Sequence, residues 1–355
     1  MIVLVEPVCQ NWMHEEVNAG LLKLVFDSTG NEIMFIAEKK HIECISKIYP
    51  NPNKKIIYKE LRIIKPNDEA DQYRTIGYYY FLLLNIQKQY RPSNIFITCA
   101  YRPCILAAEL LALWNKKAKI HVVLHGMVEK NKKNASSYPR LLKFSRFCGN
   151  LDFITYSPYC TAEYWGIKSD KIKFLHHPYI KAKRHVVEKN HKMIIGIIGA
   201  CANQKALHLI RIINRRNDTN GYQFQVASRF GNRFRGISNV KLIDLSFERK
   251  SMERQIQQMD YLLLLYGKEE YMMSASGVFW DAVSNEVPCL VLDCKYFDYY
   301  KSYNIGYQAK SISELCNIVS YHIKGNVQKE EYYVGIEKLE EHNKEVIKGI
   351  VNDSL

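Results

Sequence analysis

The stretch YLLLLYGKEEYMMSASGVFWDAVSNEVPCLVLD, Tyr261 to Asp293, decides the fold. It consists of an apolar run, a polar loop, a segment with helical spacing of apolar residues, and a second apolar run. Apolar runs that alternate with helices are typical of a parallel sheet covered on both faces. The stretch therefore predicts two parallel strands joined by a crossover helix.

The same alternation occupies the rest of the chain in two series. The first series starts with IVLVE at Ile2 and ends with KIKFLHHPY, Lys171–Tyr179, as its last strand. The second series starts with MIIGIIGA at Met193. We therefore predict an α/β fold of two Rossmann-like doubly wound domains that face a central cleft. The expected divisions are residues 1–180 for the first domain, 181–192 for a charged linker, 193–328 for the second domain, and 329–355 for a C-terminal helix that can cross back to the first domain.

Composition restricts the class of protein. The 355 residues are 47% hydrophobic and 24% charged, as in an ordinary soluble globular protein of about two domains. The N-terminus lacks a basic leader, and no run approaches the roughly 18 apolar residues of a membrane span. Ten cysteines occur without a Cys-x-x-Cys pair, mostly in apolar runs. We expect reduced, buried thiols and a cytosolic protein.

The net charge of +14 favours anionic partners such as phosphorylated small molecules, an anionic membrane surface or nucleic acid. The basic residues are scattered, with no arginine-rich tract and no nucleic-acid-binding fingerprint. Scattered charge of this kind is also typical of a plain solvated surface. We therefore do not expect nucleic acid as a partner.

Two segments in the second half of the chain favour binding of an anion. GIIGACANQK places Gly199 directly after a strand and Lys205 at the start of a helix, where backbone N–H groups attract anions. Arg229 in VASRFG again follows a strand. The Gly-x-Gly-x-x-Gly fingerprint of dinucleotide sites is missing, and each cation taken alone suits a surface position.

The stretch from Tyr261 to Asp293 contains a second helix N-terminus. Ser274 or Ser276 is expected to cap this helix, and Gly277 follows just inside it. Asp281 comes about a turn and a half later and can accept hydrogen bonds from sugar hydroxyls. The alternative is a plain capped helix whose apolar residues pack on the sheet.

The second half of the chain resembles the donor-binding half of GT-B glycosyltransferases. The segments that carry the resemblance are GIIG with Lys205, VASRFG, and the stretch from Tyr261 to Asp293. The similar enzymes are of the glycosyltransferase family 1/4-like type, which builds bacterial surface polysaccharides. The resemblance covers both halves in layout and is most specific over Leu262–Asp293. It implies transfer of a sugar from a nucleoside-diphosphate sugar to a glycan or lipid-linked acceptor. It also implies a donor-binding role for a set of residues in the second half, namely Gly199, Lys205, Arg229, Ser274, Ser276, Gly277 and Asp281.

The sequence departs from this family in one motif. Retaining members carry two glutamates with seven residues between them. Here Met273 and Asp281 occupy those two positions. The resemblance therefore implies the reaction class and leaves retention and inversion both open.

The first half offers candidates for catalysis and acceptor binding. His125 precedes a glycine at a strand end, where the resemblance implies a histidine near the donor sugar; the alternative is a core histidine. In the first strand-to-helix loop, Glu15 or His14 can serve as a general base in an inverting transferase. Glu16 and Arg102 are expected at the acceptor. Acidic residues also simply suit the first turn of a helix.

No metal and no bound cofactor are expected, because helix N-termini, Lys205 and Arg229 can stabilise a leaving diphosphate. The anionic leaflet of a membrane is an expected peripheral contact, inferred from net charge alone. Two alternatives stay open: a sugar-nucleotide epimerase of the same architecture, and a basic polyanion-binding protein.

Overall fold

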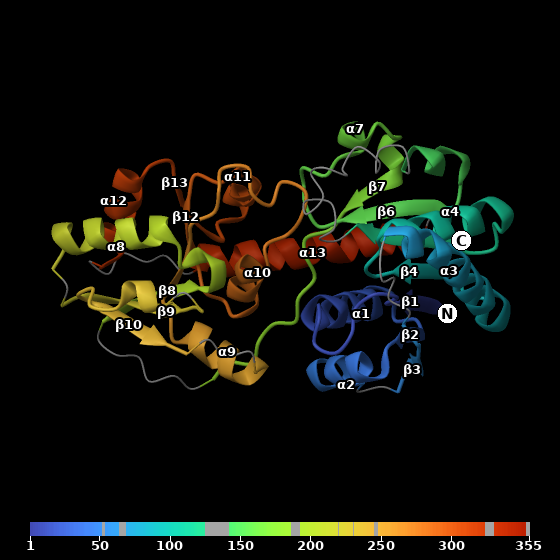
Figure 1. Ribbon diagram of the computed structural model, residues 1–355, viewed down its shortest axis with the longest axis horizontal. Coiled ribbons are helices and arrows are strands. Elements are labelled where there is room, and N and C mark those ends of the chain that lie inside the picture. Colours follow the sequence, from blue (N-terminus) through green and yellow to red (C-terminus); the bar gives the residue numbers. More distant parts are fainter. Residues whose placement is uncertain are drawn as a thin grey trace. The chain divides into compact units, whose positions relative to one another are not determined.

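The computed structural model describes residues 1–51, 54–63, 69–124, 142–185, 192–218, 220–229, 231–244, 248–323 and 330–352, with the backbone alone at 69–74, 323 and 330. The chain forms two compact units (Figure 1). Unit 1 comprises Met1–Ile180, Tyr271–Ala275 and Glu341–Leu355. Unit 2 comprises Lys181–Glu270 and Ser276–Glu340. Residues 186–191 of the expected linker and the expected domain end at residue 328 lie outside the described residues.

The described strands of unit 1 form one parallel sheet in the order β3-β2-β1-β4-β5-β6-β7. This order reverses direction between β1 and β4, as in a doubly wound Rossmann sheet. Its strands are β1 (Ile2–Val5), β2 (Ile33–Ala37), β3 (Ile56–Glu60), β4 (Asn94–Ile97), β5 (Lys119–Leu124), β6 (Leu151–Thr155) and β7 (Ile172–Phe174).

Helices cover both faces of this sheet because successive strand residues point to opposite faces. Ile2 and Leu4 of β1 pack in one core with α1, α2 and the C-terminal part of α13. Val3 and Val5 pack in the other core with α3 and α4. The helical segments are α1 (Glu15–Thr29), α2 (Lys39–Ile48), α3 (Glu69–Tyr90), α4 (Arg102–Trp114), η2 (Phe144–Phe147), α7 (Ala162–Trp165), η3 (Ser169–Lys171) and α13 (Glu330–Asn352).

Unit 2 repeats this plan with the strand order β10-β9-β8-β11-β12-β13, again all parallel. The reversal of direction lies between β8 and β11. Its strands are β8 (Met193–Ile198), β9 (Tyr222–Ala227), β10 (Val240–Ile243), β11 (Tyr261–Leu264), β12 (Cys289–Leu292) and β13 (Gly306–Ala309). Its helical segments are η4 (Gly199–Cys201), α8 (Gln204–Arg216), η5 (Gly231–Phe234), α9 (Arg249–Gln257), α10 (Gly277–Ser284), α11 (Lys295–Asp298), η6 (Tyr299–Tyr303) and α12 (Ile312–Ile323).

The predicted α/β class with two Rossmann-like sheets is confirmed. The last strand of the first series is shorter than expected, because β7 ends at Phe174. Beyond it, the backbone N–H and C=O of His176 bond to the side chain of Asn343 at 2.7 and 2.9 Å. These two bonds take the place of a strand ladder.

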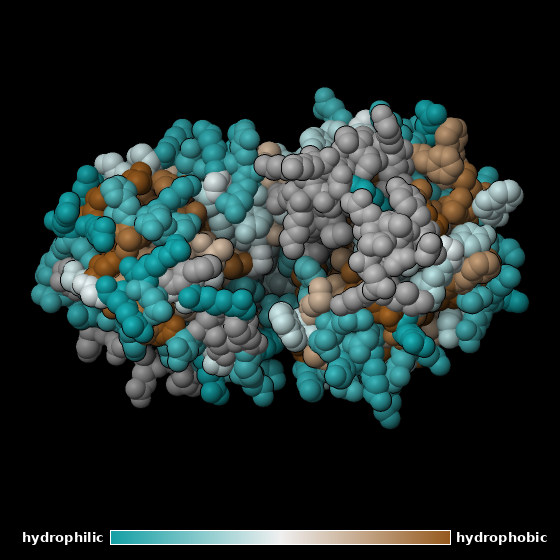
Figure 2. All heavy atoms as spheres, viewed as in Figure 1, coloured by the Kyte–Doolittle hydropathy of each residue, from teal (hydrophilic) through white to brown (hydrophobic). Residues whose placement is uncertain are grey.

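All ten cysteines are free thiols, as expected from their spacing, and nine of them are buried. No helix in the described part of the chain is long and apolar enough to cross a membrane. On the face of unit 2 shown in Figure 2, hydrophilic side chains predominate and apolar ones are scattered among them.

Candidate functional site

The carboxyl edge of the sheet in unit 2 collects most of the predicted donor-site residues. β8 ends at Ile198, and Gly199 follows with φ 61°, a left-handed conformation that favours glycine. A Cβ on Gly199 would meet nothing within 4 Å, so the backbone angle, not space, requires the glycine. The chain thereby turns sharply from the strand into α8.

Asn203 fixes the start of α8 beside the end of β11. Its side-chain oxygen accepts from the backbone N–H of Lys205 and Ala206 at 2.9 and 3.2 Å. Its amide nitrogen donates to the carbonyl of Leu265 at 3.4 Å. This cap aligns the helix N-terminus at the point where the strand order reverses, which is the usual ligand position in such sheets.

A chain of contacts then connects α8 to the start of α10. Lys205 Nζ donates to the carbonyl of Tyr266 at 3.4 Å, and the Tyr266 hydroxyl bonds to that of Ser276. Ser276 is the N-cap, fully buried, and accepts from Phe279 N at 3.2 Å. The hydroxyl of Ser276 is occupied by the cap. Gly277 is therefore the first residue of this turn that is exposed to solvent.

A cavity of about 280 Å³ opens at this edge. Its walls follow the carboxyl ends of β11, β12 and β13, and Lys205 of α8 closes it on the side of β8. Among the lining residues that the structure describes, Asp293 is the only acidic one and pairs with Lys268 at 3.4 Å, which leaves a surplus of positive charge. The lining residues are Lys205, Tyr266, Lys268, Leu292, Asp293, Lys310, Ser311 and Ile312.

Arg229 follows β9 at the same edge. Its neighbour Ser228 donates its hydroxyl to the carbonyl of Gly199 at 2.9 Å, which ties the loops after β9 and β8 together. Asp281 lies half-buried in the middle of α10, where its backbone carbonyl accepts from the side chains of Ser284 and Asn285 at 3.0 and 2.8 Å. Unit 2 thus brings Gly199, Lys205, Arg229, Ser276 and Gly277 to one edge of its sheet.

Ser274 belongs to unit 1, so the chain passes between the units at Ala275–Ser276. Within unit 1, the hydroxyl of Ser157 donates to the carbonyl of Met272 at 2.7 Å, and Met273 packs against the core on the α3 and α4 side. Ser276, not Ser274, caps α10.

The predicted residues of unit 1 follow its two central strands. His14 is exposed at the N-cap of α1 with φ 52°, and Glu15 and Glu16 form the first turn of that helix. Arg102 is the first residue of α4, which follows β4. Because β1 and β4 are neighbours, both groups lie at the carboxyl edge of this sheet. His125 lies outside the described residues.

Two of these side chains act on neighbours. Burial raises the pKa of the Cys44 thiol on α2, and the carboxylate of Glu15 raises it further. Burial, with a smaller contribution from the charge of His14, lowers the pKa of His177 to about 3. His177 is therefore neutral at physiological pH.

Glu6 is a buried carboxylate that the sequence-based reasoning did not select. Its Oε1 accepts from the backbone N–H of Val8 and Cys9, both at 2.8 Å. Its Oε2 accepts from Asn18 at 2.9 Å and from Thr98 at 2.7 Å. The carboxylate thus holds the β1–α1 loop, α1 and β4 in fixed register.

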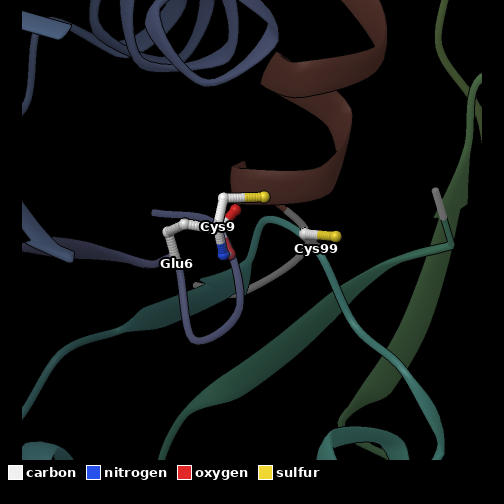
Figure 3. Close-up of side chains that lie close together, drawn as sticks. All are labelled: Glu6, Cys9 and Cys99. Carbon is white, nitrogen blue, oxygen red and sulfur yellow. The ribbon is translucent and has the colours of Figure 1, made fainter. Parts of the chain in front are cut away.

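Glu6, Cys9 and Cys99 form a buried group with the spacing of metal ligands (Figure 3). The residues fit a metal poorly, because both oxygens of Glu6 already accept two hydrogen bonds each. A metal also binds cysteine as the thiolate. A hydrogen bond with Cys99 and, to a smaller extent, burial raise the pKa of the Cys9 thiol, which favours its protonated form. We therefore interpret this group as a structural junction.

Asn203 and Glu6 each carry a local signal in the sequence. Asn203 stands one residue before a helical pattern, the position of a capping residue. Glu6 is a carboxylate at the end of an apolar strand, a placement that calls for hydrogen-bond donors. Tyr266, Lys310 and Ser311 depend on tertiary structure and carry no local signal.

Neither a protein-family profile nor a curated protein matches the sequence. Solved structures do match over nearly the whole chain. The complex of Anabaena Alr3699/HepE with UDP has a TM-score of 0.62 at 10% identity and covers 99% of this chain and 97% of its own. A glycosyltransferase from Rickettsia africae has a TM-score of 0.60 at 11% identity, covering 99% and 93%.

A third match belongs to a different enzyme class. The UDP-GlcNAc 2-epimerase of Neisseria meningitidis, bound to UDP-GlcNAc, has a TM-score of 0.59 at 15% identity and covers 100% of this chain and 97% of its own. At these identities the likeness is one of fold. With two sheets in Rossmann order, the chain has the GT-B fold, which it shares with HepE, the Rickettsia glycosyltransferase and the Neisseria epimerase.

Proposed function

We propose that the protein is a glycosyltransferase that moves a sugar from a nucleoside-diphosphate sugar to a glycan or lipid-linked acceptor. The observation that supports this most is the cationic cavity at the carboxyl edge of unit 2. It lies beside the reversal of strand order, and Lys205 and Tyr266 connect it to the capped start of α10. HepE, which shares the fold, is solved with UDP.

In this proposal the diphosphate lies against Lys205, Lys310 and the N-terminus of α10. Departure of the sugar leaves negative charge on the diphosphate, and fixed cations and helix N-termini stabilise such charge. Arg229, after β9, adds a further cation beside Gly199. These groups supply the charge that the leaving diphosphate needs, so the proposal includes neither a metal ion nor a bound cofactor.

We assign acceptor binding to unit 1. Glu15 or His14 would accept the proton of the acceptor hydroxyl, and Glu16 and Arg102 would bind the acceptor. The exposure of His14 and the partial exposure of Glu15 support this assignment. His125, which lies outside the described residues, remains a proposed catalytic residue.

The likeness to the Neisseria epimerase favours a second candidate, a sugar-nucleotide epimerase. Product analysis separates the two. Incubation with a UDP-sugar and acceptor, followed by NMR, is expected to show free UDP and a new glycosidic bond. An inverted UDP-sugar without any released UDP would contradict the transferase proposal and establish the epimerase.

We further propose that the enzyme works in the cytosol at the inner face of the membrane, in bacterial surface polysaccharide synthesis. The net charge of +14 supports contact with an anionic surface. Sedimentation with anionic vesicles at low salt, and its loss at high salt, tests this proposal.

Lys205→Gln is expected to weaken binding of the nucleoside diphosphate about 10- to 100-fold, because a hydrogen bond to a charged group contributes about 1.5–3 kcal/mol. Calorimetric titration measures the effect. Lys250→Gln is the matched control, because Lys250 is exposed on α9 and does not line the cavity. Equal affinities for the two variants would exclude Lys205 from the site.

A further inference from the structure

Two neighbouring helices of unit 1, α3 and α4, are largely apolar on the side that faces away from the sheet. They pack side by side on one face of the sheet and share its core (Figure 1). A surface helix normally carries polar and charged side chains on its outer side. Residues 75–87 of α3 include no charged residue, so this helix departs from the normal pattern.

The outer side of each helix is a stripe of apolar residues. After Arg102, the residues of α4 that are not buried recur at helical spacing and are all apolar. Phe81 of α3 is 61% exposed, and Trp114 at the end of α4 is 80% exposed. The stripes consist of Gly77, Tyr80, Phe81 and Leu84 on α3, and of Leu106, Leu110, Leu113 and Trp114 on α4.

The short helix η2 continues this surface. The Cys148 thiol, directly after η2, donates to the carbonyl of Glu109 in α4 at 3.5 Å, which holds this segment against α4. Phe144 and Phe147 of η2 are exposed, and the guanidinium of Arg146 lies 4.6 Å from the ring centre of Phe147. We call the two stripes together with Phe144 and Phe147 the apolar face. Apolar surface that spans several elements marks an interaction surface.

Positive charge surrounds the apolar face. Residues 75–91, 114–117 and 142–147 include no acidic residue and six exposed basic ones, namely Lys88, Arg91, Lys116, Lys117, Lys143 and Arg146. Helices α1 and α2, on the opposite face of the sheet, carry both signs equally. Their acidic residues are Glu15, Glu16, Asp27 and Glu43, and their basic ones are Lys23, Lys39, Lys40 and Lys47. The surplus of positive charge therefore belongs to the side that is also apolar.

We propose that the apolar face docks on an anionic membrane surface. Phe81, Trp114 and Phe147 enter the boundary between the headgroups and the acyl chains, and the six basic side chains lie among the lipid phosphates. Apolar surface with Trp, Phe and Leu, combined with Lys and Arg, is what binds a membrane interface. The inference rests on the proposed work at the inner face of the membrane and names the surface responsible.

Charge disfavours a second copy of the chain as the occupant of this face. A two-fold dimer brings the same patch of both copies together. The six basic residues of one copy would then face the six of the other, and like charges across an interface oppose association. An anionic lipid surface has the opposite charge.

Sedimentation of the full chain with vesicles of phosphatidylglycerol and phosphatidylcholine tests the apolar part. We expect the double variant Phe81→Gln/Trp114→Gln to bind at least tenfold more weakly than the wild type, with an unchanged thermal midpoint because both side chains are exposed. Tyr321→Gln/Val334→Gln is the matched control, since these are exposed apolar residues of unit 2. Wild-type binding that the Phe81/Trp114 variant retains would overturn the inference alone. Absence of wild-type binding would also overturn the proposed membrane location.

A second pair of variants separates the charge of this face from the net charge. The triple variant Lys116→Gln/Lys117→Gln/Lys143→Gln is expected to weaken vesicle binding tenfold or more. Lys39→Gln/Lys40→Gln/Lys47→Gln changes the net charge equally on α2 and should bind like the wild type. Equal losses in the two triple variants would show that net charge alone attracts the chain to the membrane, and would overturn the inference.

Tryptophan fluorescence reports the contact directly. Of the four tryptophans, Trp12 and Trp114 are exposed, whereas Trp165 and Trp280 are buried. Vesicles with brominated acyl chains quench a tryptophan that touches them. We expect the quenching to be lost in Trp114→Phe and kept in Trp12→Phe. Loss in Trp12→Phe instead would move the contact to the β1–α1 loop and overturn the inference.

Light scattering tests the second copy as occupant. The chain is expected to be free of any dimer that depends on the apolar face, and a dimer that Phe81→Gln/Trp114→Gln dissociates would overturn the inference. Titration with UDP tests sugar transfer separately, because the proposed donor site lies in unit 2.

Discussion

Gly335→Ala is expected to destabilise unit 2 by about 3 kcal/mol or more, the largest effect of a single added methyl group that we predict. Gly335 lies in α13 against the end of η6. A Cβ at this position would lie 1.6 Å from the carbonyl oxygen of Tyr303 and 2.8 Å from its carbonyl carbon. Both atoms are backbone, so relief requires the helix or the entry to β13 to move.

Chemical denaturation of purified variants measures this loss. Gly349→Ala in the same helix is the matched control, because nothing lies within 4 Å of its added Cβ and the position is exposed. Alanine favours a helix over glycine by about 0.5–1 kcal/mol, so this control should be slightly more stable than the wild type. Equal stability of the two variants would show that α13 does not pack on Tyr303 as described.

Glu109→Gln is expected to raise the free energy of unfolding by about 4 kcal/mol more at pH 8 than at pH 5. Glu109 is fully buried in α4, where the effect of burial outweighs the backbone N–H of Ser145, the group that favours the ionised carboxyl. Burial raises the pKa of this carboxyl from 4.5 to about 8. The folded chain therefore keeps a proton that the unfolded chain releases.

The sign follows from proton binding. Between pH 4.5 and about 8 the unfolded state gains stability by ionising, at about 1.4 kcal/mol per pH unit, and the folded state does not. The wild type is thus destabilised as pH rises through this window, whereas glutamine does not titrate. Glu43→Gln on α2 is the control, since an exposed carboxylate is solvated in both states. A stability difference for Glu109→Gln that does not change with pH would contradict the burial of Glu109.

Strong apolar periodicity allowed most of the fold to be predicted. MIIGIIGA contains β8, and the stretch from Tyr261 to Asp293 contains β11 and β12, because buried parallel strands carry near-continuous apolar runs. The elements that were missed include β13 and α2. The sequence of β13, GYQA, is polar and half-buried at the sheet edge. α2 is amphipathic but only ten residues long, and only two of its residues are buried.

The candidate site could be predicted only where it depends on local sequence. The cap of α10 could be narrowed to Ser274 or Ser276 because a cap is a local feature, and Lys205 could be selected because it follows a strand and a glycine. Tyr266 joins these two residues through contacts that span the reversal of strand order, and no spacing in the sequence encodes them. The division of the opening stretch, with Ser274 in unit 1 and Ser276 in unit 2, is likewise tertiary.

Calorimetric titration of the full chain with UDP, GDP, CDP, ADP and dTDP tests the central claim most directly. We predict that at least one of them binds at a single site, and that Lys205→Gln weakens this binding while Lys250→Gln does not. Absence of binding by all five nucleotides would contradict a nucleotide-sugar site at the carboxyl edge of unit 2.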